Sequence, residues 1–332
     1  MKLSRVGEFG LIERIRRAAP EGRGVRAGIG DDAAWLDCPG RNLLVTTDLL
    51  IEGIHFNLRW TSFYALGYKT LAVNLSDIAA MGGSPAFLTL SLGIPADFES
   101  ADIEEFYRGI RSLARPAGVS IVGGDTSAAG RFFVSPALIG HSRHAPVLRS
   151  GARAGDDLYV TGTLGDSALG LKLLKQKKRP ARAEKKAADF LIRRHRFPSA
   201  RLGAGALLAG AGLARAMIDV SDGLLQDLGH IAKASSVGAE VWAEALPLSR
   251  AYKTIAGRQT GHALSGGEDY ELLFSARPRD RAKLEKLKKR LGVPVTLIGR
   301  CLAPGRGVHV VNGGGKPAAL RLAGYDHFKA RS

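Results

Sequence analysis

Six aspartates of this chain close or directly follow apolar, strand-like segments. They are Asp32, Asp48, Asp77, Asp125, Asp219 and Asp222. A carboxylate is costly to bury unless it is paired, hydrogen-bonded or bound to a metal ion, and oxygen ligands suit Mg²⁺ or Ca²⁺ better than zinc. The pattern therefore predicts a hard-cation site built from several aspartates. For any single one the alternative is a helix cap, because an Asp at a helix start accepts hydrogen bonds from free backbone N–H groups.

Two glycine-rich turns also carry carboxylates. Residues 123–126 read Gly-Gly-Asp-Thr after an apolar run that has the pattern of a buried strand, and residues 266–271 read Gly-Gly-Glu-Asp-Tyr-Glu. Glycine lets backbone N–H groups approach a phosphate closely, while an adjacent carboxylate can hold the metal that neutralises it. Each turn therefore predicts a phosphate or metal contact, with a simple tight turn as the alternative.

Other motifs argue against two classes of site. Residues 28–33 imitate a dinucleotide fingerprint, but the chain continues as a strand-like run instead of a helix, and two aspartates would repel a pyrophosphate. The eight histidines are scattered and lack the Cys/His spacing of a zinc site. The sequence therefore predicts neither a Rossmann loop nor zinc chemistry.

The elements that must position these residues form two blocks. At 332 residues the chain is long enough for two domains. In the first block apolar runs alternate with helical patterns over residues 63–81 and 101–115, and a polar, Gly-rich segment near residue 150 precedes the second block. We expect a mixed α+β fold with an N-terminal domain over residues 1–147 and a C-terminal domain over residues 148–332.

The net charge of +17 is concentrated in two stretches. Residues 172–196 contain 11 Lys and Arg against two acidic residues, and residues 277–290 contain eight against two. Leu284, Leu287 and Leu291 recur at helical spacing, so the second stretch predicts an amphipathic helix with a solvated basic face. The alternative is contact with nucleic acid or another polyanion, but neither stretch has interleaved aromatics or a recognisable nucleic-acid-binding motif. Nucleic acid is therefore not the expected partner.

The sequence also bears on the cellular compartment. No apolar run approaches the roughly 20 residues of a membrane-spanning helix, and the polar start of the chain lacks the hydrophobic stretch of a signal peptide. Cys38 and Cys301 have no CxxC partner, which is typical of a reducing compartment. We expect a cytoplasmic protein without a membrane partner.

Motifs along most of the chain resemble those of the thiamine-monophosphate kinase family, which belongs to the superfamily of aminoimidazole-ribonucleotide synthetase. In chain order they are GIGDDAAWL, TTDLLIEGIHF, AVNLSDIAAMGGSPAFLTLSLGIP, GGDTS, VTGTLGDSALGL, IDVSDGLLQDLGHI, GGEDYELLF and GYDHF. The resemblance extends from about Gly7 to Phe328. It implies ATP-dependent phosphorylation of thiamine monophosphate to thiamine diphosphate, the last step of thiamine diphosphate biosynthesis, with several Mg²⁺ ions. It also implies a homodimer whose N-terminal sheets form a barrel-like interface, with the C-terminal domain completing the active site.

The resemblance assigns roles residue by residue. No side chain is needed as nucleophile or general base, because the second pKa of a phosphate acceptor is about 6, and positioning with metal ions drives transfers of this class. The implied metal ligands are Asp32, Thr46, Thr47, Asp48, Asp77, Asp125, Asp219 and Asp222, with Asp77 bridging more than one ion. The implied ATP contacts are Tyr107, Gly124, Asp125, Arg149 and Ser221. The implied contacts of thiamine monophosphate are His55, Glu268 and Tyr325.

Some of these assignments have alternatives. Tyr107 could pack within the fold, and His55, a lone histidine after an apolar stretch, could be structural. Selenophosphate synthetase would need a reactive cysteine near the N-terminus, and the hydrogenase-maturation relative would need one at the C-terminus; this chain has neither. Another ATP-using enzyme like aminoimidazole-ribonucleotide synthetase is the nearer alternative function, and a polyanion-binding protein is the more distant one.

Overall fold

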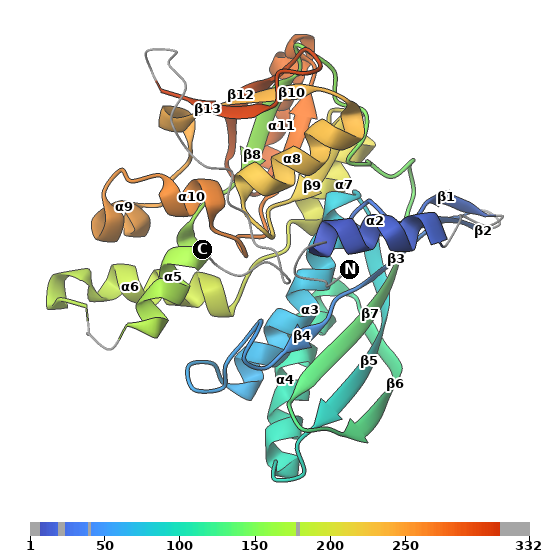
Figure 1. Ribbon diagram of the computed structural model, residues 1–332, viewed down its shortest axis with the longest axis vertical. Coiled ribbons are helices and arrows are strands. Elements are labelled where there is room, and N and C mark those ends of the chain that lie inside the picture. The colour runs from blue at the N-terminus through green and yellow to red at the C-terminus, as the bar shows by residue number, and fades with distance from the viewer. Residues whose placement is uncertain (1–6, 19–23, 39–40, 177–179, 313–332) are drawn as a thin grey trace.

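The computed structural model describes residues 7–18, 24–38, 41–176 and 180–312, which form a mixed α/β fold of two domains (Figure 1). The N-terminal sheet has the strand order β1-β2-β3-β7-β5-β6, and β4 pairs with β7. Of these strands only β5 and β6 pair in parallel. The strands are β1 (Val25–Ala27), β2 (Ala34–Cys38), β3 (Arg41–Thr47), β4 (Leu50–Ile51), β5 (Ser84–Ile94), β6 (Ser120–Ala128) and β7 (Phe133–Ser142).

Two long helices pack beside this sheet, α3 (Phe63–Ala80) and α4 (Ser100–Ala117) (Figure 1). They confirm the helices predicted over residues 63–81 and 101–115. Ser62 begins α3 because its side chain accepts the backbone N–H of Ala65 at 3.1 Å. Most of α3 is buried, since this helix contacts β3, β5 and β7 of its own sheet and also β9 and α7 of the second domain. It therefore belongs to the cores of both domains.

The crossing of α3 and α4 depends on two glycines. A Cβ atom at Gly67 would lie 1.9 Å from the carbonyl oxygen of Phe106, and one at Gly109 would lie 2.0 Å from that of Tyr64. Both distances are far below van der Waals contact, so any side chain at either position would push the helices apart. The two glycines thereby set how closely α4 approaches α3.

The C-terminal sheet has the strand order β13-β10-β12-β8-β11-β9. Only β10 and β13 pair in parallel. Its strands are β8 (Asp157–Thr161), β9 (Ala216–Asp219), β10 (Gly238–Trp242), β11 (Leu272–Ala276), β12 (Val295–Leu302) and β13 (Val308–Val311). The remaining helices are α2 (Glu8–Ala18), α5 (Asp166–Lys175), α6 (Lys185–Arg196), α7 (Leu202–Gly210), α8 (Leu224–Ser235), α9 (Arg250–Ala256), α10 (Gly261–Ser265) and α11 (Arg281–Leu291). Residues 143–156 join the two sheets, and the predicted division at residue 147 falls within this connection.

Strand β6 corrects one expectation from the sequence. The apolar run before residue 123 has the pattern of a buried strand, but every residue of β6 is exposed. The reason is that, among the described strands, β6 pairs with β5 alone and lies at the edge of an open sheet. Among the described residues of one chain this sheet stays open, and the barrel-like interface that the resemblance implies would need the sheets of two chains.

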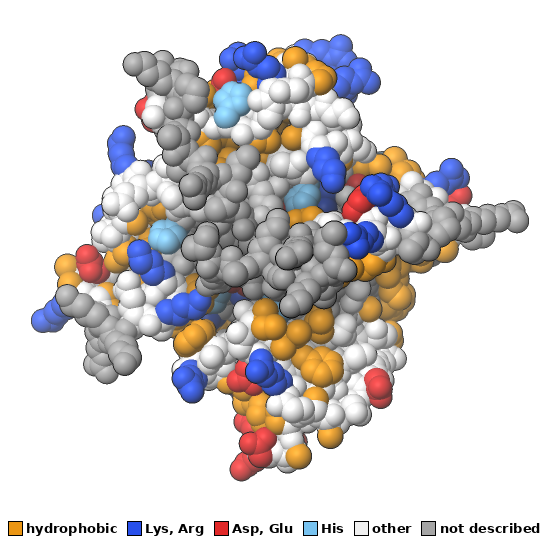
Figure 2. Space-filling model, viewed as in Figure 1, with side chains coloured by type: hydrophobic (Ala, Val, Ile, Leu, Met, Phe, Trp, Pro, Cys, Tyr) orange, Lys and Arg blue, Asp and Glu red, His pale blue; other side chains and the backbone are white. Residues whose placement is uncertain are grey.

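The basic stretches lie largely on helices. Helix α11 buries Leu284 and Leu291 and confirms the predicted amphipathic pattern, while α6 buries Ala188 and Leu191. On the face shown in Figure 2, Lys and Arg side chains lie in separate groups and not in one continuous patch. Among the described residues no helix is both long and apolar enough to cross a membrane.

Candidate functional site

Strand ends and turns from both domains meet near the last turn of α3. Asp77 lies in that turn, Asp48 directly follows β3, and Asp32 lies in the turn before β2. From the second domain, Asp219 ends β9 and Asp222 lies in the turn before α8. The contact between α3 and β9 brings these segments together. Polar side chains at the ends of buried elements can then meet at the boundary between the domains without lying in either hydrophobic core. We call this meeting point of the five aspartates the seam.

Three of these carboxylates form a compact group. One oxygen from each of Asp32, Asp77 and Asp219 lies within 4.8 Å of the others. The hydroxyl of Thr46 donates a hydrogen bond of 2.5 Å to Oδ2 of Asp77. The predicted meeting of aspartates from both domains is therefore present in one chain, and Thr46 reaches it from β3.

The electrostatics of the group follow from burial and like charge. Burial, followed by the charge of Asp222, raises the pKa of Asp48 to about 6. Burial, followed by the charge of Asp32, raises the pKa of Asp219 to about 7. Asp77 has its pKa raised well above the ordinary value by burial and by Asp48, Asp219 and Asp32. Such a site stores repulsion that a bound cation would relieve.

The donor set fits a hard divalent cation. Oδ2 of Asp48 and Oδ2 of Asp219 are buried and accept no hydrogen bond from the described residues. A buried carboxylate oxygen without a partner is costly, whereas Mg²⁺ prefers oxygen ligands of this kind. The orphaned oxygens and the close carboxylates therefore make this seam a candidate metal site.

Arg149 bounds the group on one side. Its Nε and Nη2 donate to the two oxygens of Asp32 at 3.2 and 3.1 Å, and its backbone N–H donates to Asp31 at 3.1 Å. Burial lowers the pKa of this guanidinium, but Asp32 outweighs burial and raises it. Arg149 is therefore a fixed cation beside the carboxylates.

Two aspartates of the site, Asp31 and Asp227, were not predicted from the sequence. Burial and then the charge of Asp32 raise the pKa of Asp31 to about 7. Oδ2 of Asp227 accepts the backbone N–H groups of Ser221, Asp222 and Gly223 at 3.1, 3.2 and 3.1 Å. Asp227 thereby shapes the turn that presents Ser221 and Asp222. Asp227 lies within α8 and follows no strand. The only signal for it in the sequence is its spacing of five residues from Asp222, just before this helix.

The structure does not bring Asp125 into this group within one chain. In the sheet order β7 and β5 separate β3 from β6, and Asp125 lies in register with Ser91 and Ser135, on the opposite face from the buried Leu90 and Leu92. Its carboxylate accepts the Thr126 N–H at 2.9 Å.

Thr47 and Gly124, two other residues predicted to contact the metal or ATP, also make contacts outside the carboxylate group. Thr47 is exposed and donates to the Pro136 carbonyl at 2.6 Å. Gly124 has a φ of +159°, and a Cβ there would lie 2.0 Å from the Leu90 carbonyl oxygen. The requirement for glycine at residue 124 therefore comes first from its pairing with β5.

The turn over residues 266–271 is strained at two side chains. Glu268 and Tyr270 have φ values of +67° and +53°, in a region that residues other than glycine rarely adopt. The turn packs on the Ser221 segment, because the Glu268 N–H donates to the Ser221 carbonyl at 2.7 Å. Strain of this kind gathers at functional sites, and here it fixes the direction of the Glu268 side chain.

Lys69 and His195 both contact the carboxylate of Glu268. Lys69 Nζ, from α3, lies 2.5 Å from Oε1, and His195 Nδ1, from α6, lies 3.2 Å from Oε2. Burial would raise the pKa of Glu268, but the Lys69 charge and the His195 contact outweigh burial and lower it. Glu268 is thus an ionised carboxylate held between the two domains.

The other two acidic residues of this turn bind neighbouring segments inside the C-terminal domain. Asp269 accepts the N–H groups of Gly165 and Ser167 at 2.5 and 3.1 Å, and burial raises its pKa to about 8. Glu271 is fully buried and binds Thr161, Arg194 and Arg201. Of the three carboxylates in the turn, only Glu268 is partly open to a ligand.

Two further sequence candidates, His55 and Tyr107, have local contacts of their own. His55 accepts the Ile51 N–H at Nδ1 over 3.0 Å, which is a local role in its loop. Tyr107 is half-buried on α4, with its ring 5.7 Å from that of Phe106, so it packs within the N-terminal core. Tyr325 lies outside the described residues.

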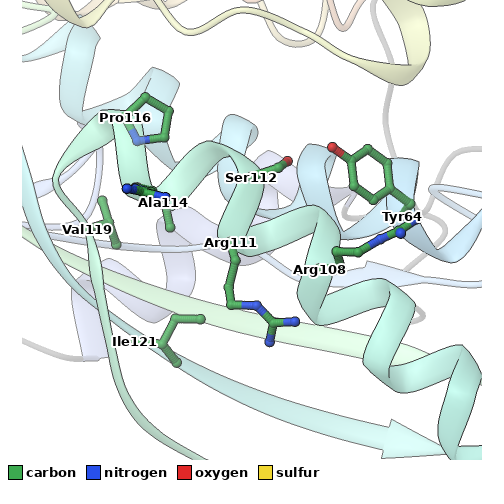
Figure 3. Close-up of a pocket in the computed structure, with 9 residues that line it drawn as sticks. Tyr64, Arg108, Arg111, Ser112, Ala114, Pro116, Val119 and Ile121 are labelled. Carbon is green, nitrogen blue, oxygen red and sulfur yellow. The ribbon is translucent and has the colours of Figure 1, made fainter.

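A pocket of about 1010 Å³ lies between α4 and the start of β6 (Figure 3). In Figure 3 Arg111 extends toward Ile121, while Arg108 reaches toward Tyr64. The Arg108 guanidinium lies 5.2 Å from the Tyr64 ring centre. No carboxylate of the seam lines this pocket, so the candidate metal site is separate from it.

Comparison with known proteins places this geometry in a family. The model for AIR synthase related protein, N-terminal domain, matches residues 30–141, and the model for its C-terminal domain matches residues 153–312. Thiamine-monophosphate kinase of Escherichia coli O157:H7 is 43% identical over 327 residues, which cover 97% of this chain and 98% of that protein.

Solved structures agree with this match. AaThiL complexed with AMPPCP and TMP superimposes with a TM-score of 0.84 at 37% identity and covers 98% of this chain and 99% of its own. Thiamine-monophosphate kinase from Stenotrophomonas maltophilia K279a gives 0.75 at 41% identity, covering 94% and 98%. The chain therefore belongs to the thiamine-monophosphate kinase family of AIR synthase-related proteins.

Proposed function

We propose that this protein transfers the γ-phosphoryl group of ATP to thiamine monophosphate and releases thiamine diphosphate and ADP. The observation that carries the proposal is the buried carboxylate group at the domain seam, with oxygens of Asp48 and Asp219 left without a hydrogen-bond partner. Its relatives support the substrates, since they are named thiamine-monophosphate kinase and one solved relative holds the ATP analogue AMPPCP together with TMP.

The chain's own residues divide the work of this transfer. Mg²⁺ held by the seam would offset the negative charge of the two phosphate-bearing substrates. The ligands would be Asp32, Thr46, Asp48, Asp77, Asp219 and Asp222. Arg149 and the Ser221 turn would bind the phosphates of ATP, while Glu268, held by Lys69 and His195, would orient thiamine monophosphate. The acceptor oxygen is already ionised, so no side chain needs to remove a proton from it.

Asp125, Gly124 and Thr47 act, in this proposal, across a homodimer interface. Strand β6 is a nine-residue exposed edge. Its Val122 is 56% exposed, and Phe87 on the neighbouring β5 is 48% exposed. An uncovered edge with apolar side chains is a template for pairing with another chain. Side chains on the outer face of this sheet would then face the partner. We expect His55, Tyr107 and Tyr325 to serve the substrates once both chains and ligands are present, and we expect the protein in the cytoplasm.

A coupled assay of ADP release tests the proposal. With Mg²⁺ and ATP we expect turnover with thiamine monophosphate, none with thiamine, and none when the metal is chelated. Folding is monitored separately by circular dichroism. Absence of turnover by folded protein with thiamine monophosphate would remove this function, and turnover with thiamine alone would reassign the acceptor.

A further inference from the structure

Four arginines from three separate segments meet at the end of the C-terminal sheet that lies opposite the carboxylate seam. Arg153 comes from the connection between the sheets, Arg215 directly precedes β9, and Arg277 and Arg279 follow β11. With Pro278 they line a pocket of about 580 Å³. Strands β9 and β11 separate this pocket from the site, because β9 begins after Arg215 and ends at Asp219, while β11 runs antiparallel to it.

Two of these arginines, Arg215 and Arg277, form ion pairs with buried carboxylates. Asp156 is 3% exposed, lies 3.3 Å from Nη1 of Arg215, and accepts the Arg153 backbone N–H at 2.8 Å. Asp280 is 7% exposed and lies 3.0 Å from Nε of Arg277. That Nε is buried and makes no well-aligned hydrogen bond within the described residues. The pocket wall is therefore fixed by buried charge.

The guanidinium groups of Arg153 and Arg279 are exposed and form no ion pair or hydrogen bond with the described residues. Four cations thus face two carboxylates, and Lys283 shares Asp280 at 3.6 Å. Neighbouring Arg281 is matched by Asp157 at 2.6 Å and does not reduce this excess. Converging positive charge of this kind repels itself in an empty pocket and is relieved by a bound anion.

We propose that this pocket binds a small anion that carries two or more linked phosphate groups. Arginine presents a planar fork of donors that matches phosphate oxygens in pairs, and four forks exceed what a single phosphate needs. The volume is that of a small-molecule site. The described residues that line the pocket include no aromatic ring on which a base could stack, which disfavours single-stranded nucleic acid as the occupant.

The proposed pocket binds its anion without a metal ion. Binding measured in the absence of metal therefore distinguishes this pocket from the seam. Inorganic pyrophosphate is titrated into the full-length protein by calorimetry in EDTA at low salt, where the unneutralised seam carboxylates repel it. The test variant is Arg153→Ala/Arg279→Ala, and Arg290→Ala is the matched control, because Arg290 is exposed on α11 and lies outside this pocket. Melting temperature and Mg²⁺-dependent turnover confirm that both arginine variants are intact, and melting temperature alone does so for Asp77→Asn.

We expect one pyrophosphate per chain, affinity at least tenfold weaker in the double variant, and unchanged affinity in Arg290→Ala and in Asp77→Asn. Turnover of the double variant stays at the wild-type level. No binding by the wild type, or equal weakening in Arg290→Ala, would overturn the proposal and leave only general surface charge. Tighter binding in Asp77→Asn, which removes a negative charge that repels pyrophosphate, would move the site to the seam.

Discussion

At the scale of single residues, Asp77 is the centre of the candidate site. It accepts the Thr46 hydroxyl, approaches Asp32 and Asp219, and lies on the helix shared by both cores. We expect Asp77→Asn to lower turnover at least a hundredfold, because it removes a charge that metal binding needs, while circular dichroism and melting show an intact fold. Asp97→Asn, at an exposed aspartate in the loop after β5, is the matched control and should leave kcat unchanged. Near-normal kinetics of Asp77→Asn would refute the metal assignment.

Lys69 is a positioning residue, because it acts through Glu268. It is 6% exposed and pairs with Glu268 across the domain seam. We expect Lys69→Met to raise the KM for thiamine monophosphate about tenfold with little change in the KM for ATP, a split that a general loss of stability would not give. Lys286→Met, at an exposed lysine of α11, is the control. Equal increases in both KM values would remove Lys69 from substrate positioning.

At the scale of elements, β6 connects the edge of the sheet with oligomerisation. Val122 is the most exposed large apolar residue on this strand. We expect Val122→Lys to convert a dimer to a monomer, since a lysine on an edge strand opposes pairing with a second chain, and light scattering after gel filtration measures the change. Phe190→Lys, which removes a 43% exposed apolar residue from α6, should leave the dimer intact. A monomeric wild type would contradict the proposed interface.

The same elements show how far the sequence could predict the fold and the site. Helical periodicity predicted α3 and α4, and aspartates at segment ends predicted the seam around Asp77 and Asp219. The exposure of β6 was not predictable, because an apolar run has the same pattern whether a second layer of one chain or another chain covers it. Asp227 was missed because three backbone N–H groups converge on it only after the turn has folded.

At the scale of the whole molecule, the seam couples stability to pH and to metal. The pKa values of Asp48 and Asp219 are raised to about 6 and about 7, above the ordinary 3.8. The folded protein therefore binds protons more tightly than the unfolded chain, and this proton binding stabilises the fold. The contribution is full below the ordinary pKa of 3.8 and is lost as the pH rises through the folded values of about 6 and about 7. We expect the metal-free protein to melt several degrees lower at pH 8 than at pH 6, with Mg²⁺ restoring most of the loss at pH 8 only. Melting curves in EDTA and in Mg²⁺ at both pH values measure this, and a metal effect equal at the two pH values would contradict it.

We expect carboxylates of both domains to hold the metal ions together. Electron paramagnetic resonance can count bound Mn²⁺, as a stand-in for Mg²⁺, on the protein with AMPPCP. We predict more than one Mn²⁺ per chain in the wild type and fewer in both Asp77→Asn and Asp219→Asn, whose aspartates come from different domains. One ion or none in the wild type would contradict the binding of several ions, and an unchanged count in either variant would contradict a metal site built by the two domains.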